Sequence, residues 1–139
     1  MNHVSKKSEW QPEYSVHVAA LDAQHRHLFS LLLEIEAALD RGQGTKAAER
    51  IIPGLIAYTQ YHFGEEERLM ALHSFPGLGA HKQEHEILTR RVLLFKKSHD
   101  EGKPAVPMSL LIFLREWLTK HILGTDMQYA EFFRRLGVS

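Results

Sequence analysis

The chain has 139 residues, of which 44% are hydrophobic and 24% charged, and this is enough to enclose the core of one domain. Its seventeen basic and seventeen acidic residues cancel, so its net charge gives no indication of a nucleic-acid partner or an anionic membrane surface. The absence of cysteine excludes disulfides, iron–sulfur clusters and thiolate metal sites. No hydrophobic run is long enough to span a bilayer, and the polar start lacks a secretory signal. We therefore expect a cytoplasmic monomer.

Glycine and proline divide the chain into four predicted helices, at about residues 18–39, 45–72, 78–98 and from Pro107 onward. In each helix, apolar residues or histidines recur at spacings of three and four, which is typical of helices packed in a bundle. Pro53-Gly54 either kinks the second helix or marks its true start. We predict an all-α, antiparallel up-down four-helix bundle. A single domain would cover residues 1–139, with a short extended N-terminal arm at about 1–17 and the bundle at about 18–136.

The core-facing positions of these helices contain histidine where leucine, isoleucine or valine is expected. The residues are His25, His62, His81, His85 and His121, and all four helices contribute. Burying one imidazole without a partner costs roughly 1–3 kcal/mol, so five of them would remove much of a stability of about 5–15 kcal/mol. Bound metal would compensate all of them together, because a neutral imidazole nitrogen is a good ligand.

Spacing supports a metal site on two of the helices. His81 and His85 are four residues apart, so both rings lie on one face and can bind the same ion. His62 and Glu66 have the same offset, which places a carboxylate one turn from an imidazole. Taken alone, such a pair is often a chance surface feature, and Glu66 could belong to a solvated run of charges. The repetition of the pattern at core-facing positions favours metal binding.

The last helix supplies a less regular pair. His121 and Asp126 are five residues apart, which separates them by about 140° on a straight α-helix. They can converge only if the helix is widened or broken, and Gly124 lies where this could happen. With His25, which alone could be a hydrogen-bonded core residue, the set contains five imidazoles and two carboxylates. This is too many for one ion and suits two ions that share carboxylates; iron, manganese or zinc would fit.

A series of motifs over roughly residues 10–129 strengthens this interpretation. The motifs are Trp10, Tyr14-Ser15-Val16, Leu21-Asp22-Ala23-Gln24-His25, His62-Phe63, Glu65-Glu66, Phe75-Pro76, His81 with His85, Trp117-Leu118, His121-Ile122, Asp126 and Tyr129. In these motifs the chain resembles the hemerythrin family in its bacterial single-domain form. Every metal-ligand position of the family is filled by the expected residue type.

The resemblance implies a non-haem di-iron centre. One iron would be bound by His81, His85 and His121, and the other by His25 and His62. Glu66 and Asp126 would bridge the two ions, together with an oxygen derived from solvent.

The resemblance also implies that dioxygen binds reversibly at the second iron. The apolar pocket for it would be lined by Phe63, Trp117, Leu118, Ile122 and Tyr129. We expect a role in oxygen storage, delivery or scavenging and no enzymatic activity, with an unknown partner for delivery or reduction. The alternatives are an oxygen, redox or nitric-oxide-responsive protein, a peroxidase or reductase, and a protein of iron handling.

His17 departs from the family pattern, because the family usually has glycine at this position. Glycine there suggests that the backbone passes close to another group. We expect His17 to point to solvent; the alternative is that it reaches the metal site as an extra ligand or as a partner of a ligand. His3, His27, His73 and His99 match no core-facing position, and we interpret them as surface residues.

Overall fold

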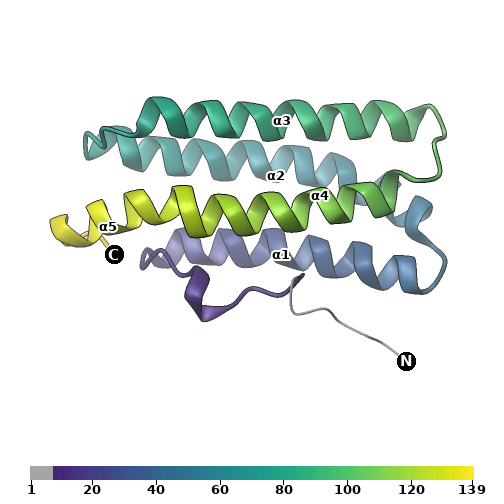
Figure 1. Ribbon diagram of the computed structural model, residues 1–139, viewed down its shortest axis with the longest axis horizontal. Helices are drawn as coiled ribbons and strands as arrows, with labels where there is room; N and C mark the ends of the chain where they lie inside the picture. The colour runs from purple at the N-terminus through teal and green to yellow at the C-terminus, as the bar shows by residue number, and fades with distance from the viewer. Residues whose placement is uncertain (1–7) are drawn as a thin grey trace.

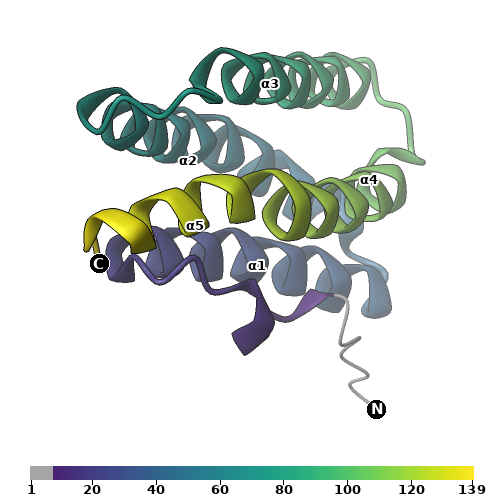
Figure 2. The ribbon, with the colours of Figure 1, turned by 60° about the vertical axis from the view of Figure 1, so that its left-hand side comes forward.

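The computed structural model describes residues 8–139, and every regular element in this range is helical (Figure 1). The elements are η2 (Pro12–Tyr14), α1 (Ala19–Asp40), α2 (Gly44–Leu72), α3 (Leu78–Asp100), α4 (Val106–Lys120), η3 (His121–Asp126) and α5 (Met127–Leu136). Helices α1 to α4 lie side by side with alternating direction, and α5 extends the line of α4 beyond η3 (Figures 1 and 2). This confirms the predicted all-α, up-down bundle.

The helix boundaries agree with the predicted ones to within about two residues, with one interpretation corrected. Helix α2 begins at Gly44 and runs through Pro53 to Leu72, so the alternative in which it starts at Pro53-Gly54 is wrong. Helix α4 has Pro107 in its first turn, where a missing backbone N–H removes no intrahelical hydrogen bond.

The N-terminal arm is not wholly extended, because η2 forms one turn of 3-10 helix within it. Asp22 of α1 fastens the arm, since one carboxylate oxygen accepts the Ser15 hydroxyl at 2.6 Å and the other accepts the Val16 backbone N–H at 2.8 Å. Tyr14 stacks on Phe29 with ring centroids 5.2 Å apart. The arm is therefore packed on α1 at its described residues.

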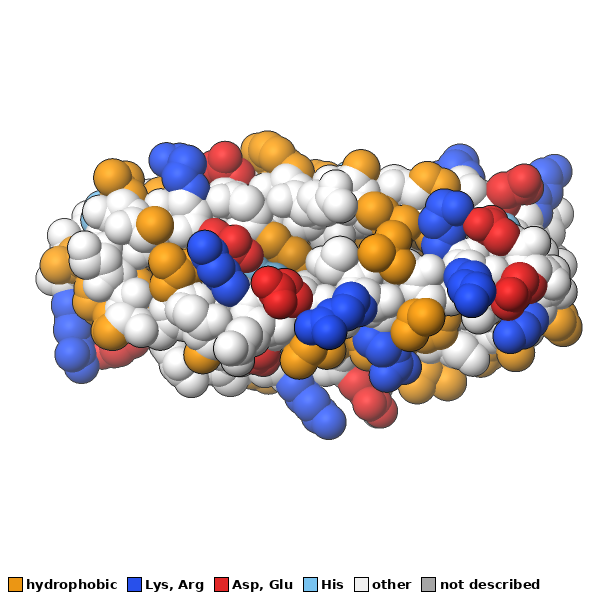
Figure 3. Space-filling view, turned by 90° about the horizontal axis from the view of Figure 1, so that it is seen from above, with side chains coloured by type: hydrophobic (Ala, Val, Ile, Leu, Met, Phe, Trp, Pro, Cys, Tyr) orange, Lys and Arg blue, Asp and Glu red, His pale blue; other side chains and the backbone are white. Residues whose placement is uncertain are grey.

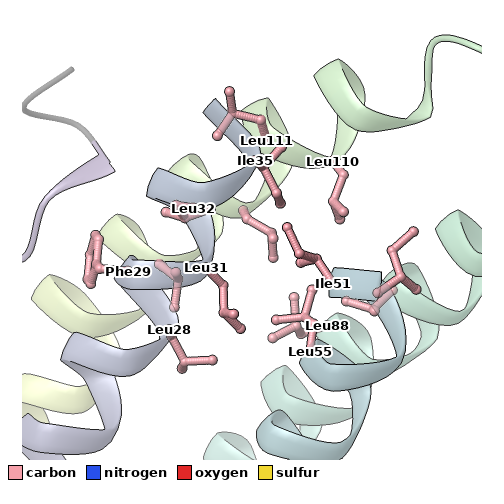
Figure 4. Packing of buried hydrophobic residues seen from close by; sticks show 14 of the residues in the cluster. Leu28, Phe29, Leu31, Leu32, Ile35, Ile51, Leu55, Leu88, Leu110 and Leu111 are labelled. Atoms are coloured by element: carbon pink, nitrogen blue, oxygen red, sulfur yellow. The ribbon is translucent and has the colours of Figure 1, made fainter. Parts of the chain in front are cut away.

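Apolar side chains form two separate clusters along the bundle. The larger one includes Leu28, Leu32, Ile35, Ile51, Leu55, Leu88, Leu110 and Leu111, and Figure 4 shows side chains of α1, α2, α3 and α4 pointing toward one another there. The smaller one contains Val16, Val18, Leu21, Met70, Tyr129, Ala130 and Phe133. Buried polar residues of α1, α2, α3 and η3 complete the interior.

The outer surface carries mixed side chains. On the face over α3, charged and hydrophobic groups alternate in small patches (Figure 3). None of the described helices combines the length and the apolar composition needed to cross a membrane.

Candidate metal centre

The structure brings the seven predicted ligands together in the interior of the bundle. Their side chains come from α1 (His25), α2 (His62 and Glu66), α3 (His81 and His85) and the two ends of η3 (His121 and Asp126). Each of these residues is at most 4% exposed. Polar side chains on the core-facing sides of four helical elements therefore meet in the interior, where a bundle would ordinarily be filled with aliphatic side chains.

The π-helical turn η3 explains how His121 and Asp126 converge. Hydrogen bonds between residues five apart widen the helix, and Nε2 of His121 lies 3.0 Å from Oδ1 of Asp126. The predicted widening is confirmed. Gly124 is not needed for space, because a Cβ there would meet nothing within 4 Å. Thr125 fastens the turn from outside by donating its hydroxyl to Oε1 of Glu84 at 3.0 Å.

The side chains form two donor groups that share one carboxylate. The first, here named the three-histidine group, contains His81, His85, His121 and Glu66. The second, the two-histidine group, contains His25, His62 and Glu66. In each group, one candidate ligand atom per residue lies within 4.8 Å of all the others. Each group can therefore hold one ion, and Glu66 can bind both.

Asp126 also spans the two groups. Its Oδ1 atom lies 2.9 Å from Nε2 of His81 and 3.0 Å from Nε2 of His121, which belong to the three-histidine group. Its Oδ2 atom lies 3.2 Å from Nε2 of His25 in the two-histidine group. One carboxylate facing two sets of imidazoles in this way has the position of a bridging ligand.

The hydrogen-bonding state of these atoms tests whether metal fits. In the described part of the chain, the buried atoms without a hydrogen-bond partner include Oε1 of Glu66, both carboxylate oxygens of Asp126 and Nε2 of His81, His85 and His121. Several of these atoms lie about as close as hydrogen-bonded ones, yet none is aligned to donate or accept. Buried polar atoms are seldom left in this state. They face a common interior, so the residues fit a pair of cations with mixed nitrogen and oxygen ligands.

The electrostatics of the site also favour positive charge. Burial lowers the pKa of His25, but Asp126 and Glu66 outweigh this effect and raise it to about 10. Burial and the same two carboxylates act in this way on His81, whose pKa rises to about 9. Burial raises the pKa of Glu66, but the histidines around it hold that pKa well below its usual value. Without metal, protons on imidazoles balance the carboxylates, and a metal ion would replace them.

Two aromatic side chains predicted to line the ligand pocket stack on imidazoles of the three-histidine group. The Phe63 ring lies parallel to His85 with centroids 3.7 Å apart, and Trp117 lies nearly parallel to His121 at 4.2 Å. Phe63 is buried, whereas Trp117 is only half-buried and lines an open surface pocket of about 300 Å³. Trp117 therefore forms part of the wall between the site and solvent.

The other three predicted lining residues are buried, and one of them, Tyr129, also makes a hydrogen bond within the site. Leu118 and Ile122 belong to the larger apolar cluster. The hydroxyl of Tyr129 donates a hydrogen bond to Oε2 of Glu66. Burial and the nearby Asp126 and Glu66 raise the pKa of Tyr129 well above its usual value, so the hydroxyl keeps its proton and acts as a donor.

Sequence reasoning missed the groups that hold the outer nitrogens of the imidazoles. Nδ1 of His62 lies 2.6 Å from Oε1 of Gln24, and Nδ1 of His85 lies 2.8 Å from Oε2 of Glu67. Metal-binding imidazoles usually donate their second N–H in this way. The sequence contains one indication of these partners: each of them is the neighbour of a predicted ligand, since Gln24 precedes His25 and Glu67 follows Glu66.

His17 lies outside the metal centre, as expected. Its side chain is exposed, and its backbone N–H donates to the Ser15 hydroxyl at 3.1 Å. Its φ angle is 60°, in the left-handed region that glycine adopts without strain. This angle is a physical reason for glycine at such a position.

The other histidines that the structure describes also lie apart from both donor groups, although they are not equally exposed. His27 is exposed, as expected, while His73 and His99 are half-buried. The His73 ring is partly covered by Phe133, with centroids 5.5 Å apart. His3 lies outside the described residues.

Comparison with known proteins matches this arrangement to a family. The model of the hemerythrin HHE cation-binding domain matches residues 16–133. A bacteriohemerythrin of Stenotrophomonas maltophilia is 31% identical over 122 residues, which cover 88% of this chain and 78% of that protein. A bacteriohemerythrin of Clostridium acetobutylicum is 30% identical, covering 88% and 98%. A myohemerythrin of Riftia pachyptila is 28% identical, covering 86% and 88%. Because the family model matches most of the chain, from the end of the arm through the π turn into α5, this chain belongs to the hemerythrin family.

Proposed function

We propose that this chain binds dioxygen reversibly at a pair of iron ions, and that it serves in oxygen storage, delivery or scavenging without acting as an enzyme. The observation that carries the proposal is the pair of buried donor groups that share Glu66. Membership of the hemerythrin family supports a di-iron, oxygen-binding protein. A bound ferrous pair would supply the electrons with which dioxygen is held.

The composition of the ligand set favours binding over oxidation. Di-iron proteins of the ferritin-like class use four carboxylates and two histidines, and anionic ligands stabilise highly oxidised metal. Here five imidazoles, which would bind metal as neutral ligands, stand beside only two carboxylates, Glu66 and Asp126. This set leaves the ions less electron-rich, so the reaction with dioxygen is expected to stop before its O–O bond breaks.

The surroundings of the site support reversibility. Phe63, Leu118 and Ile122 are at most 5% exposed and cover the ligands with apolar surface. This apolar surface keeps water and its protons away from the site. Water and protons would otherwise promote loss of the reduced dioxygen and irreversible oxidation of the iron. The Tyr129 hydroxyl is already donated to Glu66, so its proton is held at a defined atom.

A cycle of oxygenation tests the proposal. The protein is loaded with iron, reduced under argon, freed of reductant and titrated with dioxygen, while its visible spectrum and oxygen uptake are recorded. We expect one dioxygen per iron pair, a visible band that appears on oxygenation, and loss of the band under argon over several cycles. Glu65→Ala is a matched control for Glu66→Ala, because Glu65 is adjacent to Glu66 in the sequence but pairs with the exposed Arg68.

Two outcomes would contradict the proposed function. The first is immediate oxidation of the reduced protein with no reversible species, even on rapid mixing. The second is sustained consumption of hydrogen peroxide or nitric oxide at a rate far above that of the Glu66→Ala variant, which would make the chain an enzyme.

A further inference from the structure

Two imidazoles of the three-histidine group, His85 and His121, have outer nitrogens that face carboxylates. Nδ1 of His85 lies 2.8 Å from Glu67, and Nδ1 of His121 lies 3.5 Å from Oε1 of Glu84, which also accepts the Thr125 hydroxyl at 3.0 Å. The Glu67 side chain is 25% exposed and the Glu84 side chain 41% exposed. Each lines an open surface pocket beside its histidine. Anionic acceptors at the edge of the protein therefore support two imidazoles of this group.

The two-histidine group has no such support within the described part of the chain. Nδ1 of His62 lies 2.6 Å from the neutral amide oxygen of Gln24, which is buried. Nδ1 of His25 is buried without a hydrogen-bond partner. The donor groups thus differ in the charge around their imidazoles as well as in the number of histidines.

We propose that Glu67 and Glu84 are positioning residues that make the three-histidine group the tighter metal position, and that Gln24 keeps the two-histidine group weaker. The proposal rests on the metal pair of the proposed function. An imidazole that donates its N–H to a carboxylate becomes a more basic ligand at its other nitrogen, and such partners typically change metal affinity by about 10–100-fold. The neutral amide of Gln24 fixes the His62 ring and its tautomer but adds little basicity.

The distances rank the two carboxylates. The Glu67 hydrogen bond is short, and its acceptor is the more buried of the two, so it is screened less by solvent. The Glu84 contact with His121 is at the limit of hydrogen-bond distance, and the same oxygen is shared with Thr125. Glu67 therefore has the larger effect on affinity, and Glu84 the smaller.

Zinc titration tests this inference without oxygen or redox chemistry. Metal-free protein is titrated with Zn²⁺ in competition with a chelator, and the two binding constants are determined. Three histidines bind before two on ligand number alone, so the informative quantity is the ratio of the two constants. We expect Glu67→Gln to lower the association constant of the tighter position about tenfold, with a smaller decrease for Glu84→Gln. Gln24→Glu should raise the association constant of the weaker position by about the same factor. The ratio of the two association constants should therefore also decrease.

Matched controls and a spectroscopic readout complete the test. Glu65→Gln and Glu86→Gln change acidic residues on the same two helices whose ion-pair partners are exposed arginines, and both should leave the ratio unchanged. Imidazole ¹⁵N resonances should show the first equivalent of Zn²⁺ at His81, His85 and His121. If Glu67→Gln and Glu84→Gln bind two ions with an unchanged ratio, this inference alone is wrong, whether or not Gln24→Glu folds. If the wild-type protein binds fewer than two ions, the proposed metal pair fails as well.

Discussion

The hydroxyl of Tyr129 donates a hydrogen bond to Oε2 of Glu66, although the two residues are 63 positions apart in the sequence. Both side chains are fully buried. The contact joins α5 to the carboxylate shared by both donor groups. The C-terminal helix, which contributes to neither donor group, therefore fixes the orientation of the residue that belongs to both.

Tyr129→Phe removes this hydrogen bond and leaves a buried carboxylate oxygen short of a donor. We expect the free energy of unfolding of the metal-free protein to fall by about 1–3 kcal/mol, as measured by urea denaturation. Tyr61→Phe is the control, since Tyr61 is 56% exposed, and it should change stability by less than about 0.5 kcal/mol. Equal effects of the two substitutions would contradict the assigned role.

His17→Gly relieves a left-handed backbone conformation, because the φ angle at this position is 60°. We expect the free energy of unfolding to rise by about 1 kcal/mol, with the visible spectrum of the iron-loaded protein unchanged. Lys97→Gly, at an exposed position within α3, should instead lower stability by about 1 kcal/mol. A loss of stability in His17→Gly, or a shift of its absorption bands, would be the opposite of this prediction.

Iron retention should depend on the two shared carboxylates. Elemental analysis of protein expressed with sufficient iron should approach two irons per chain, and Glu66→Ala or Asp126→Ala should lower this content strongly. Each variant removes a carboxylate that faces both donor groups. His27→Ala and His99→Ala remove imidazoles outside the site and should keep the iron. Comparable losses in all four variants would show that the seven residues are not the ligands.

Leu118→Ala should open the apolar cover of the site. Leu118 is 4% exposed and belongs to the same apolar cluster as Ile122, so its truncation leaves a cavity that costs about 2–5 kcal/mol of stability. We expect the oxygenated protein to lose its visible band several-fold faster, because water reaches the ligands more easily. Leu123→Ala is the comparison, since Leu123 is 41% exposed on the outside of the π turn. Unchanged decay in a folded Leu118→Ala protein would remove this pocket wall from the proposal.

The helices and the convergence of the seven residues could be predicted because spacing determines which side chains share a helix face. The need for a widened helix also followed from spacing, since His121 and Asp126 are five residues apart. The left-handed angle of His17 could not be predicted, because backbone torsion is decided by how the arm docks on Asp22. The outer partner Glu67 was hidden for another reason. Within a run of three glutamates, only the packing of α2 against α3 decides which one reaches His85.

The π turn makes the convergence of His121 and Asp126 depend on the pitch of the helix as well as on residue type. Each residue of an α-helix advances the chain by about 100° around the axis, so η3 accommodates one residue more than a regular helix would. Deleting exposed Leu123 or Gly124 would restore ordinary α-helical pitch. His121 and Asp126 would then be four residues apart and would still share one helix face, as His81 and His85 do. A regular α-helix that kept all six residues of η3 would instead place Asp126 about 140° around the axis from His121 and turn one of them away from the core, although both side chains would still be present.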